Sequence, residues 1–391
     1  MKEQPVPEDQ NLAKLYSWVR DIVQNEIHHN WLHGTAKPQR VSIGPPSEIG
    51  ATDAIILQAD VHVRIFVKMH PEDPKRELQG YNILCQGPQE FVEHLVPPIP
   101  SSLDSPHLLW LTPHVDATTL HQLVYRNSSS SHFNRWIKEL YADFLRNMGE
   151  LWTSTKTFSP PNLRQIYVER IWDKIGRMNE ILNIDNIMDM HIKVNTNEYG
   201  LFSGLMDRFI DQVDSANKNM HFACTTHGDE HAKNIMVYEE TISRKSSGWI
   251  IVDYVNAKKE ADWIFSIAHM LQWWQFYYVL ELAKRDQNLE QALNARMVLN
   301  DNVLTIEYNQ EVLESHISSR CLELKQMLLT FAQRIAKDFG EDEQNWRQRL
   351  NLALFSVIFA AAPLHFGKAD FALPIMIGES LKSLVGSSLT W

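Results

Sequence analysis

The spacing of hydrophobic and polar positions changes along this 391-residue chain. Apolar residues recur at helical spacing between residues 11 and 31, which predicts an amphipathic helix. From Arg40 onward the pattern changes to short β-branched runs bounded by glycine, proline and aspartate. These runs predict three antiparallel strands, at 40–43, 54–57 and 61–68.

A helix and a further strand complete the predicted sheet region. Residues 74–90 carry apolar positions suited to one helix, and residues 108–111 form a short apolar run suited to a strand. The segment from Thr112 to Asp116 then reads as a hinge. Together these patterns predict a small antiparallel sheet with one helix.

Beyond the hinge the pattern is mainly helical. A long amphipathic helix is predicted at 134–153. Further helices are predicted at 165–182, 201–218, 262–284, 288–299, 304–337 and 343–361. The predicted fold class is therefore α+β, with a small sheet followed by a larger helical part. The longest apolar run, 350–366, is interrupted by polar residues and is shorter than the roughly 20 residues that span a bilayer, so it predicts a buried helix.

Composition narrows the partners and the compartment. A net charge of -11 disfavours nucleic acid, whose phosphates attract basic surfaces, and suits a neutral or cationic ligand. The three cysteines, Cys85, Cys224 and Cys321, are far apart and form no CxxC pair, which argues against a disulfide framework or zinc ribbon. Residues 1–5 show no apolar signal core, so we expect a cytoplasmic protein with no membrane partner.

The chemistry concentrates in one segment. Residues 227–234 read HGDEHAKN, and Asp253 follows the apolar run 249–252. Phosphoryl transfer from Mg-ATP needs a carboxylate that accepts the proton of the attacking hydroxyl, and oxygen ligands that hold magnesium against the phosphates. We therefore assign Asp229 as the catalytic base, and Asn234 and Asp253 as magnesium ligands.

Two other interpretations fit parts of this segment. An aspartate and an asparagine can cap a turn by bonding backbone amides, although this does not explain the joint spacing of all three residues. His227, Asp229 and His231 alternate and have side chains that suit zinc, but no further ligand cluster lies nearby. His227 is more simply explained as a residue that braces the loop by hydrogen bonding.

The order and spacing of Asp229, Asn234 and Asp253 resemble the aminoglycoside phosphotransferase and choline kinase superfamily, small-molecule relatives of the protein kinases. The resemblance implies a protein-kinase-like bilobal fold. In it, residues 36–113 form the nucleotide-binding N-lobe, and residues 114–391 form the helical C-lobe with the catalytic loop and acceptor pocket. Residues 1–35 form an N-terminal helical extension.

The resemblance also implies where the nucleotide is held. Lys68 matches the lysine that grips phosphate, and Glu77 is its expected carboxylate partner, with Glu72 as the second choice. The expected nucleotide-covering loop lies between Ile43 and Ala54, and the candidate nucleotide-contacting residues are Gly44, Ser47, Gly50, Thr112 and His114.

This loop departs from a typical glycine-rich loop. Pro45 and Pro46 remove two amide donors, and Glu48 places a negative charge where phosphate is expected. The departure supports an alternative, a nucleotide-binding pseudokinase or regulatory protein of the same fold.

The implied function is transfer of the γ-phosphate of ATP or GTP, with Mg²⁺, to a hydroxyl of a small acceptor of an aminoglycoside-, choline-, sugar- or amino-alcohol-like kind, for which a cationic group is one option. A Ser/Thr protein kinase is a further alternative, but only eight residues separate Asp253 from Asp262 and leave little room for an activation loop. Asp262 is expected to cap a helix. The aromatic run 273–278, followed by Glu281 and Asp286, has side chains that suit a cationic amine, although aromatic residues at helical spacing are more often part of a buried core. The sequence identifies neither the acceptor nor the oligomeric state.

Overall fold

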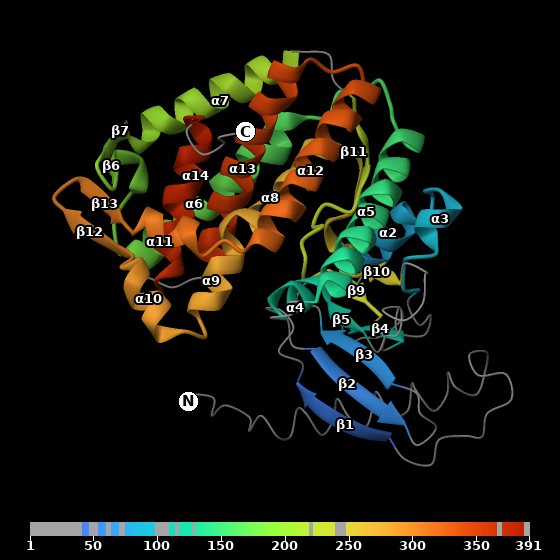
Figure 1. The fold of residues 1–391 in the computed structure, drawn as a ribbon. Coiled ribbons are helices and arrows are strands. Elements are labelled where there is room, and N and C mark those ends of the chain that lie inside the picture. Colours follow the sequence, from blue (N-terminus) through green and yellow to red (C-terminus); the bar gives the residue numbers. More distant parts are fainter. Residues whose placement is uncertain are drawn as a thin grey trace, which may run out of the picture.

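The computed structural model describes residues 41–46, 54–59, 64–69, 75–97, 109–113, 117–126, 130–218, 222–238, 248–365 and 370–386. The predicted helix at 11–31 lies outside these residues. The β-branched runs form an antiparallel sheet in the order β1-β2-β3-β4 (Figure 1), as the alternation predicts. Only the backbone course of these strands is described. Their bounds are Val41–Pro46, Ala54–Ala59, Arg64–Met69 and Leu109–Pro113.

Two boundaries in this sheet differ from the prediction. Gly44 lies in strand β1 rather than in a loop, and the register shifts between Ile43 and Pro46. Prolines lack a donor for the ladder, and β1 accepts them because it is an edge strand. Thr112 pairs with Phe66 inside β4, so the predicted hinge begins too early. Pairing with β3 extends β4 as far as Pro113, and it outweighs the tendency of this proline to start a turn.

The predicted helix at 74–90 is two helices, α2 (Lys75–Leu84) and α3 (Gln89–Val92). Pro88 stands at the N-cap of α3, where its fixed backbone starts a new helix and cannot continue the old one. α2 packs against a short 3-10 turn, η5 (Tyr254–Asn256). A Cβ on Gly80 would lie 1.8 Å from the Tyr254 carbonyl oxygen, so only glycine permits this contact.

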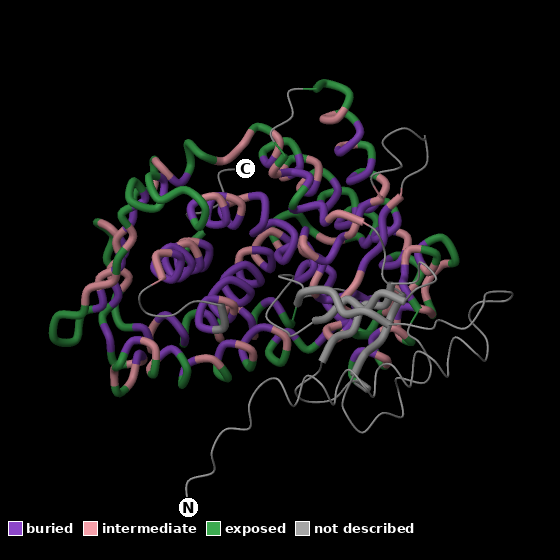
Figure 2. Tube along the Cα trace, turned by 90° about the horizontal axis from the view of Figure 1, so that it is seen from below, coloured by how far each residue is buried: buried purple, intermediate pink, exposed green. Residues whose placement is uncertain are grey.

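The larger part is helical, as predicted, and its buried core is shown in Figure 2. The apolar run predicted to be a buried helix is α13 (Glu343–His365), which packs against α6, α8 and α14. Among the described residues, no helix is long and apolar enough to cross a membrane. The other helices are α4 (Leu120–Tyr125), α5 (Ser131–Ser154), η2 (Arg164–Glu169), α6 (Arg170–Leu182), η3 (Ile187–Asp189), α7 (Phe202–Lys218), α8 (Trp263–Gln272), η6 (Trp273–Tyr277), α9 (Tyr278–Ala283), α10 (Gln287–Leu293), α11 (Gln310–Ser315), α12 (Ser319–Asp338) and α14 (Ala372–Leu384).

A second four-stranded sheet was not predicted. Strands β12 (Arg296–Asn300), β13 (Val303–Glu307), β6 (His191–Val194) and β7 (Asn197–Leu201) form it in that order. The predicted helices at 288–299 and 304–337 are therefore wrong over 296–307. Leu304 and Ile306 are buried while their neighbours are more exposed, and this period of two is a strand pattern.

Short strands hold the segment that carries the chemistry. Strands β9 (Ile235–Val237), β10 (Trp249–Ile251) and β5 (Thr118–Thr119) form one small sheet. Strands β8 (Cys224–Thr226) and β11 (Lys258–Ala261) form another. The loop between β8 and β9 contains Asp229 and leads directly into Asn234. Two ladders therefore fix both ends of the proposed catalytic loop.

Candidate active site

Glu230 sets the shape of the loop from inside it. Its carboxylate is buried and accepts hydrogen bonds from the backbone amides of His227 at 3.0 Å and Gly228 at 3.1 Å. The Ser266 hydroxyl on α8 donates a third bond at 2.7 Å. Gly228 has φ +82°, and a Cβ there would lie 2.3 Å from the Asn256 carbonyl oxygen. Sequence reasoning missed Glu230, because only burial distinguishes it from an exposed loop carboxylate.

His227 braces the loop as predicted. Its Nε2 lies 3.0 Å from the Val252 carbonyl oxygen, immediately before Asp253. This nitrogen is therefore engaged with the backbone. Among the described residues, no group of three or more His, Cys, Asp or Glu side chains is placed to enclose a metal ion. The zinc interpretation thus has no ligand set in this part of the chain.

Asn234 and Asp253 are brought together by the β9–β10 ladder. Val252 donates its backbone amide to the Asn234 carbonyl oxygen at 3.0 Å. The Asn234 side-chain amide donates to the Asp229 carbonyl oxygen at 2.9 Å, and this bond orients the side chain. Asp253 has a left-handed backbone with φ 70°, an uncommon conformation that concentrates at functional sites.

This pair fits a magnesium ion. Mg²⁺ prefers hard oxygen donors, and proteins commonly supply one or two while waters and phosphates complete the octahedron. The Asn234 amide nitrogen is held by Asp229, which leaves its side-chain oxygen as the ligand atom. The Asp253 carboxylate would supply the second oxygen ligand.

Two histidines face the carboxylate of Asp229. His269 Nδ1 lies 3.2 Å from Asp229 Oδ1, and His231 Nε2 lies 3.7 Å from the same oxygen. Burial alone would raise the pKa of Asp229, but the charges of His231 and His269 outweigh it and hold that pKa well below its ordinary value. Asp229 is therefore ionised at neutral pH. Sequence reasoning missed His269, which is 40 residues away in the chain.

Glu77 lies beside Tyr254, the residue that follows Asp253. Its side chain is buried, and the Tyr254 backbone amide lies 3.4 Å from its Oε1. The expected partner, Lys68, occupies the central strand β3 opposite Ala54 and Trp110. Lys68 is the second-last residue of β3 rather than the last. The pairing of Glu77 with Lys68 stays a prediction.

Of the remaining nucleotide candidates, two lie in strands of the sheet and three are not among the described residues. Gly44 lies in β1 and Thr112 lies in β4. Ser47, Gly50 and His114 lie outside the described residues.

Asp262 is structural, as predicted. It caps α8 by accepting from the Ile264 amide at 3.1 Å, and it is fully buried. It also accepts a hydrogen bond from the Tyr167 hydroxyl at 2.5 Å and forms an ion pair with Arg349 at 3.1 Å. Arg349 pairs with Glu341 as well. This buried cluster joins the start of α8, which carries Ser266 and His269, to α13.

The fold, an antiparallel sheet followed by a mainly helical part, can be compared with those of known proteins. No protein-family model matches the sequence, and no curated protein matches it. The crystal structure of choline kinase LicA from Streptococcus pneumoniae matches with a TM-score of 0.52 and 10% identity, over 95% of this chain and 99% of that chain. LicA in complex with AMP matches with a TM-score of 0.50 and 10% identity, over 94% and 98%. An ethanolamine kinase from Plasmodium vivax matches with a TM-score of 0.49 and 10% identity, over 100% of this chain and 95% of that chain.

The chain therefore has the fold of the aminoglycoside phosphotransferase and choline kinase superfamily, which confirms the resemblance drawn from Asp229, Asn234 and Asp253. At 10% identity the likeness concerns the fold alone.

Proposed function

We propose that this protein is a magnesium-dependent kinase that transfers the γ-phosphate of ATP or GTP to a hydroxyl of a small molecule. The observation that carries the proposal is the bond from the Val252 amide to the Asn234 carbonyl oxygen. This bond joins the backbone of Asn234 to the residue before Asp253, and the Asn234 side-chain amide donates to the Asp229 carbonyl oxygen, which supports a shared role for these three residues. The kinase fold of LicA supports the same conclusion.

The proposed enzyme has two lobes. Residues 36–113 form the nucleotide lobe around the β1–β4 sheet, and residues 114–391 form the helical lobe. Residues 1–35 precede them as a helical extension. Lys68 on β3 holds the nucleotide phosphates, with Glu77 as its partner. Gly44, Ser47, Gly50, Thr112 and His114 are the further nucleotide contacts in this proposal.

The reaction is a direct transfer. The acceptor hydroxyl oxygen attacks the γ-phosphorus, and the bond from that phosphorus to the bridging oxygen breaks. The nucleoside diphosphate leaves with the bond electrons, and the hydroxyl proton passes to the Asp229 carboxylate. His269 Nδ1 lies 3.2 Å from Asp229 Oδ1, so we assign the other oxygen, Oδ2, to face the acceptor. When bound to Asn234 and Asp253, Mg²⁺ supplies charge that offsets the phosphate oxygens.

A matched pair of variants tests the proposal. Asp229→Asn keeps the shape of the side chain but removes the base, so transfer should fall by about 10²–10⁴-fold. Its thermal shift with Mg-ATP or Mg-GTP should persist. Asp253→Asn should instead abolish the magnesium-dependent part of that shift. Retained transfer in Asp229→Asn, or an unchanged shift in Asp253→Asn, would contradict the assigned roles.

The second candidate is a nucleotide-binding protein without transfer activity. Pro45 and Pro46 within β1 favour it, because they remove amide donors close to the predicted phosphate position. A magnesium-dependent nucleotide shift without diphosphate release for any acceptor would support this candidate over the kinase.

A further inference from the structure

Arg170 is a cation that interacts with the charge of Asp229 but forms no ion pair with any of the described residues. It begins α6, and its guanidinium carbon lies 5.3 Å from the centre of the Phe265 ring. Its Nε is buried without a hydrogen-bond partner, and the described residues provide it with no ion pair. Burial lowers the pKa of Arg170, while the charge of Asp229 acts in the opposite direction. An unpaired cation is costly to desolvate, so this position favours an anionic ligand.

Lys233 is a second cation, connected to Asp229 through Trp273 and His231. The Lys233 ammonium lies 5.4 Å from the centre of the Trp273 ring, and that ring lies 5.2 Å from the His231 ring. His231 in turn faces Asp229 at 3.7 Å. Arg170 is connected to the base in a similar way: its guanidinium lies over the Phe265 ring, and that ring is 4.9 Å from the ring of His269. Each of the two histidines that face the proposed base is therefore linked through an aromatic ring to a positively charged side chain.

The groups that would bind a cationic amine are already used inside the protein. Glu281 accepts from Lys233 at 3.4 Å and from Lys284 at 3.2 Å. Trp273 is buried beneath Lys233. Asp286 accepts from the backbone amides at the start of α10, where it is the N-cap. The aromatic and acidic run that the sequence associates with an amine thus serves this chain's own cations.

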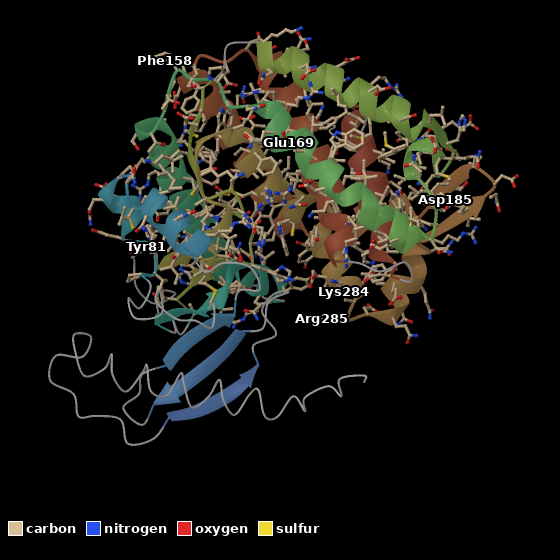
Figure 3. All side chains as sticks on the ribbon, turned by 180° about the vertical axis from the view of Figure 1, so that it is seen from behind. Tyr81, Phe158, Glu169, Asp185, Lys284 and Arg285 are labelled. Carbon is tan, nitrogen blue, oxygen red and sulfur yellow. The ribbon has the colours of Figure 1, made fainter. Side chains whose placement is uncertain are left out.

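The rim beside this region is positively charged. Lys284 and Arg285 are exposed at the end of α9, where Figure 3 labels them next to each other. The Arg285 guanidinium lies 5.5 Å from the Tyr125 ring centre. The pKa of the buried His121 ring responds to the charged side chains around it, which include Lys233, Glu281 and Arg285. After burial, the charge of Lys233 contributes most to lowering its pKa, and Arg285 acts in the same direction.

We infer that the acceptor is a small hydroxylated molecule that also carries an anionic group, a carboxylate or a phosphate, bound by Arg170 beside Asp229. The inference rests on the proposed kinase function. The anionic group does not react: the hydroxyl oxygen takes the phosphoryl group, and its proton passes to Asp229. Arg170 and Lys233 offset the repulsion between the acceptor's charge and the nucleotide phosphates. Lys284 and Arg285 attract the anion toward the site.

The test is diphosphate release by the full chain with a matched acceptor panel. The panel pairs hydroxy acids with their amides, sugar phosphates with the free sugars, and adds amino alcohols. Anionic members should have KM values at least about tenfold below those of their neutral partners, as expected for a charge-assisted contact. Comparing the KM values of the hydroxy acids with those of the sugar phosphates shows whether the site prefers a carboxylate or a phosphate.

Arg170→Gln and Arg164→Gln form the variant pair. Arg164 lies in the adjacent turn η2, in an exposed ion pair with Asp214, and serves as the control. Arg170→Gln should raise KM for the anionic acceptor about 10–100-fold, the range of a lost bond to a charged group. KM for nucleotide should not change. Because Arg170 forms no ion pair with the described residues, its replacement should leave the melting temperature unchanged or raise it.

Three results would overturn the inference. The first is preferred turnover of neutral or amine acceptors. The second is no turnover of any acid by a protein that binds Mg-nucleotide. The third is a fall in kcat that is equal for every acceptor in Arg170→Gln, which would show that the arginine only compensates Asp229. A protein that binds no Mg-nucleotide would instead refute the proposed kinase function.

Discussion

His269 Nδ1 lies 3.2 Å from Asp229 Oδ1, although the two residues come from different elements, α8 and the loop after β8. His269 is buried, so this contact is shielded from water. A donor on one carboxylate oxygen fixes the plane of the carboxylate and favours its ionised form. His269 is therefore a positioning residue for the proposed base.

His269→Leu should reduce kcat by roughly 10–100-fold, because it removes a hydrogen bond to a charged group. The pKa of Asp229 is held below its ordinary value partly by His269. Without that donor the pKa rises, so the acidic limb of kcat/KM should move to higher pH. His269→Asn keeps an amide donor near the Nδ1 position and should recover part of both effects. A lower melting temperature with an unchanged pH profile in His269→Leu would indicate a merely structural role.

Gly80→Ala should separate α2 from Tyr254. The new Cβ would lie 1.8 Å from the Tyr254 carbonyl oxygen, so the backbone must shift and the Glu77 contact at 3.4 Å must lengthen. Urea unfolding should show a loss of about 1–3 kcal/mol, as for overpacked sites. The magnesium-dependent nucleotide shift should weaken as well.

Gly176→Ala is the matched control, because it makes the same change inside α6 with no atom within 4 Å of the new Cβ. Alanine is the better helix former, so this variant should gain about 0.5–1 kcal/mol. Equal effects of the two substitutions would contradict the proposed close contact at Gly80.

Arg349→Met should be strongly destabilising. It leaves Asp262 and Glu341 buried without their cation, and breaking such a pair costs about 3–5 kcal/mol. Lys138→Gln removes an exposed pair with Glu323 at 3.3 Å and should cost no more than about 1 kcal/mol. Chemical denaturation at neutral pH measures both. A loss in Arg349→Met no larger than that in Lys138→Gln would show that the buried cluster does not hold α8 and α13 together.

His121 should make stability depend on pH. Burial, together with the charge of Lys233, lowers its pKa from 6.5 to about 3. The unfolded chain therefore binds a proton at His121 between pH 6.5 and about 3 while the folded chain does not. Its contribution to stability is present above pH 6.5 and is lost as pH falls through this window, at up to about 1.4 kcal/mol per pH unit. His121→Phe should reduce the slope of unfolding free energy against pH between pH 6.5 and about 3. An unchanged slope would show that His121 does not cause this pH dependence.

The sequence determined the small antiparallel sheet, the mainly helical remainder and the order of Asp229, Asn234 and Asp253. These features depend on local periodicity and on spacing within one segment, which a chain carries without its neighbours. The same holds for the cap at Asp262, since capping involves residues two or three positions apart.

Tertiary structure alone decided which side chains surround the proposed base. His269 and Arg170 come from α8 and α6, and no spacing along the chain indicates that they meet Asp229. It also brought Glu281 into an ion pair with Lys233, because these two residues lie 48 positions apart in the chain and meet only after folding. Local pattern fixes an element and its type, whereas long-range packing decides burial and charge pairing, and these set the chemistry of the site.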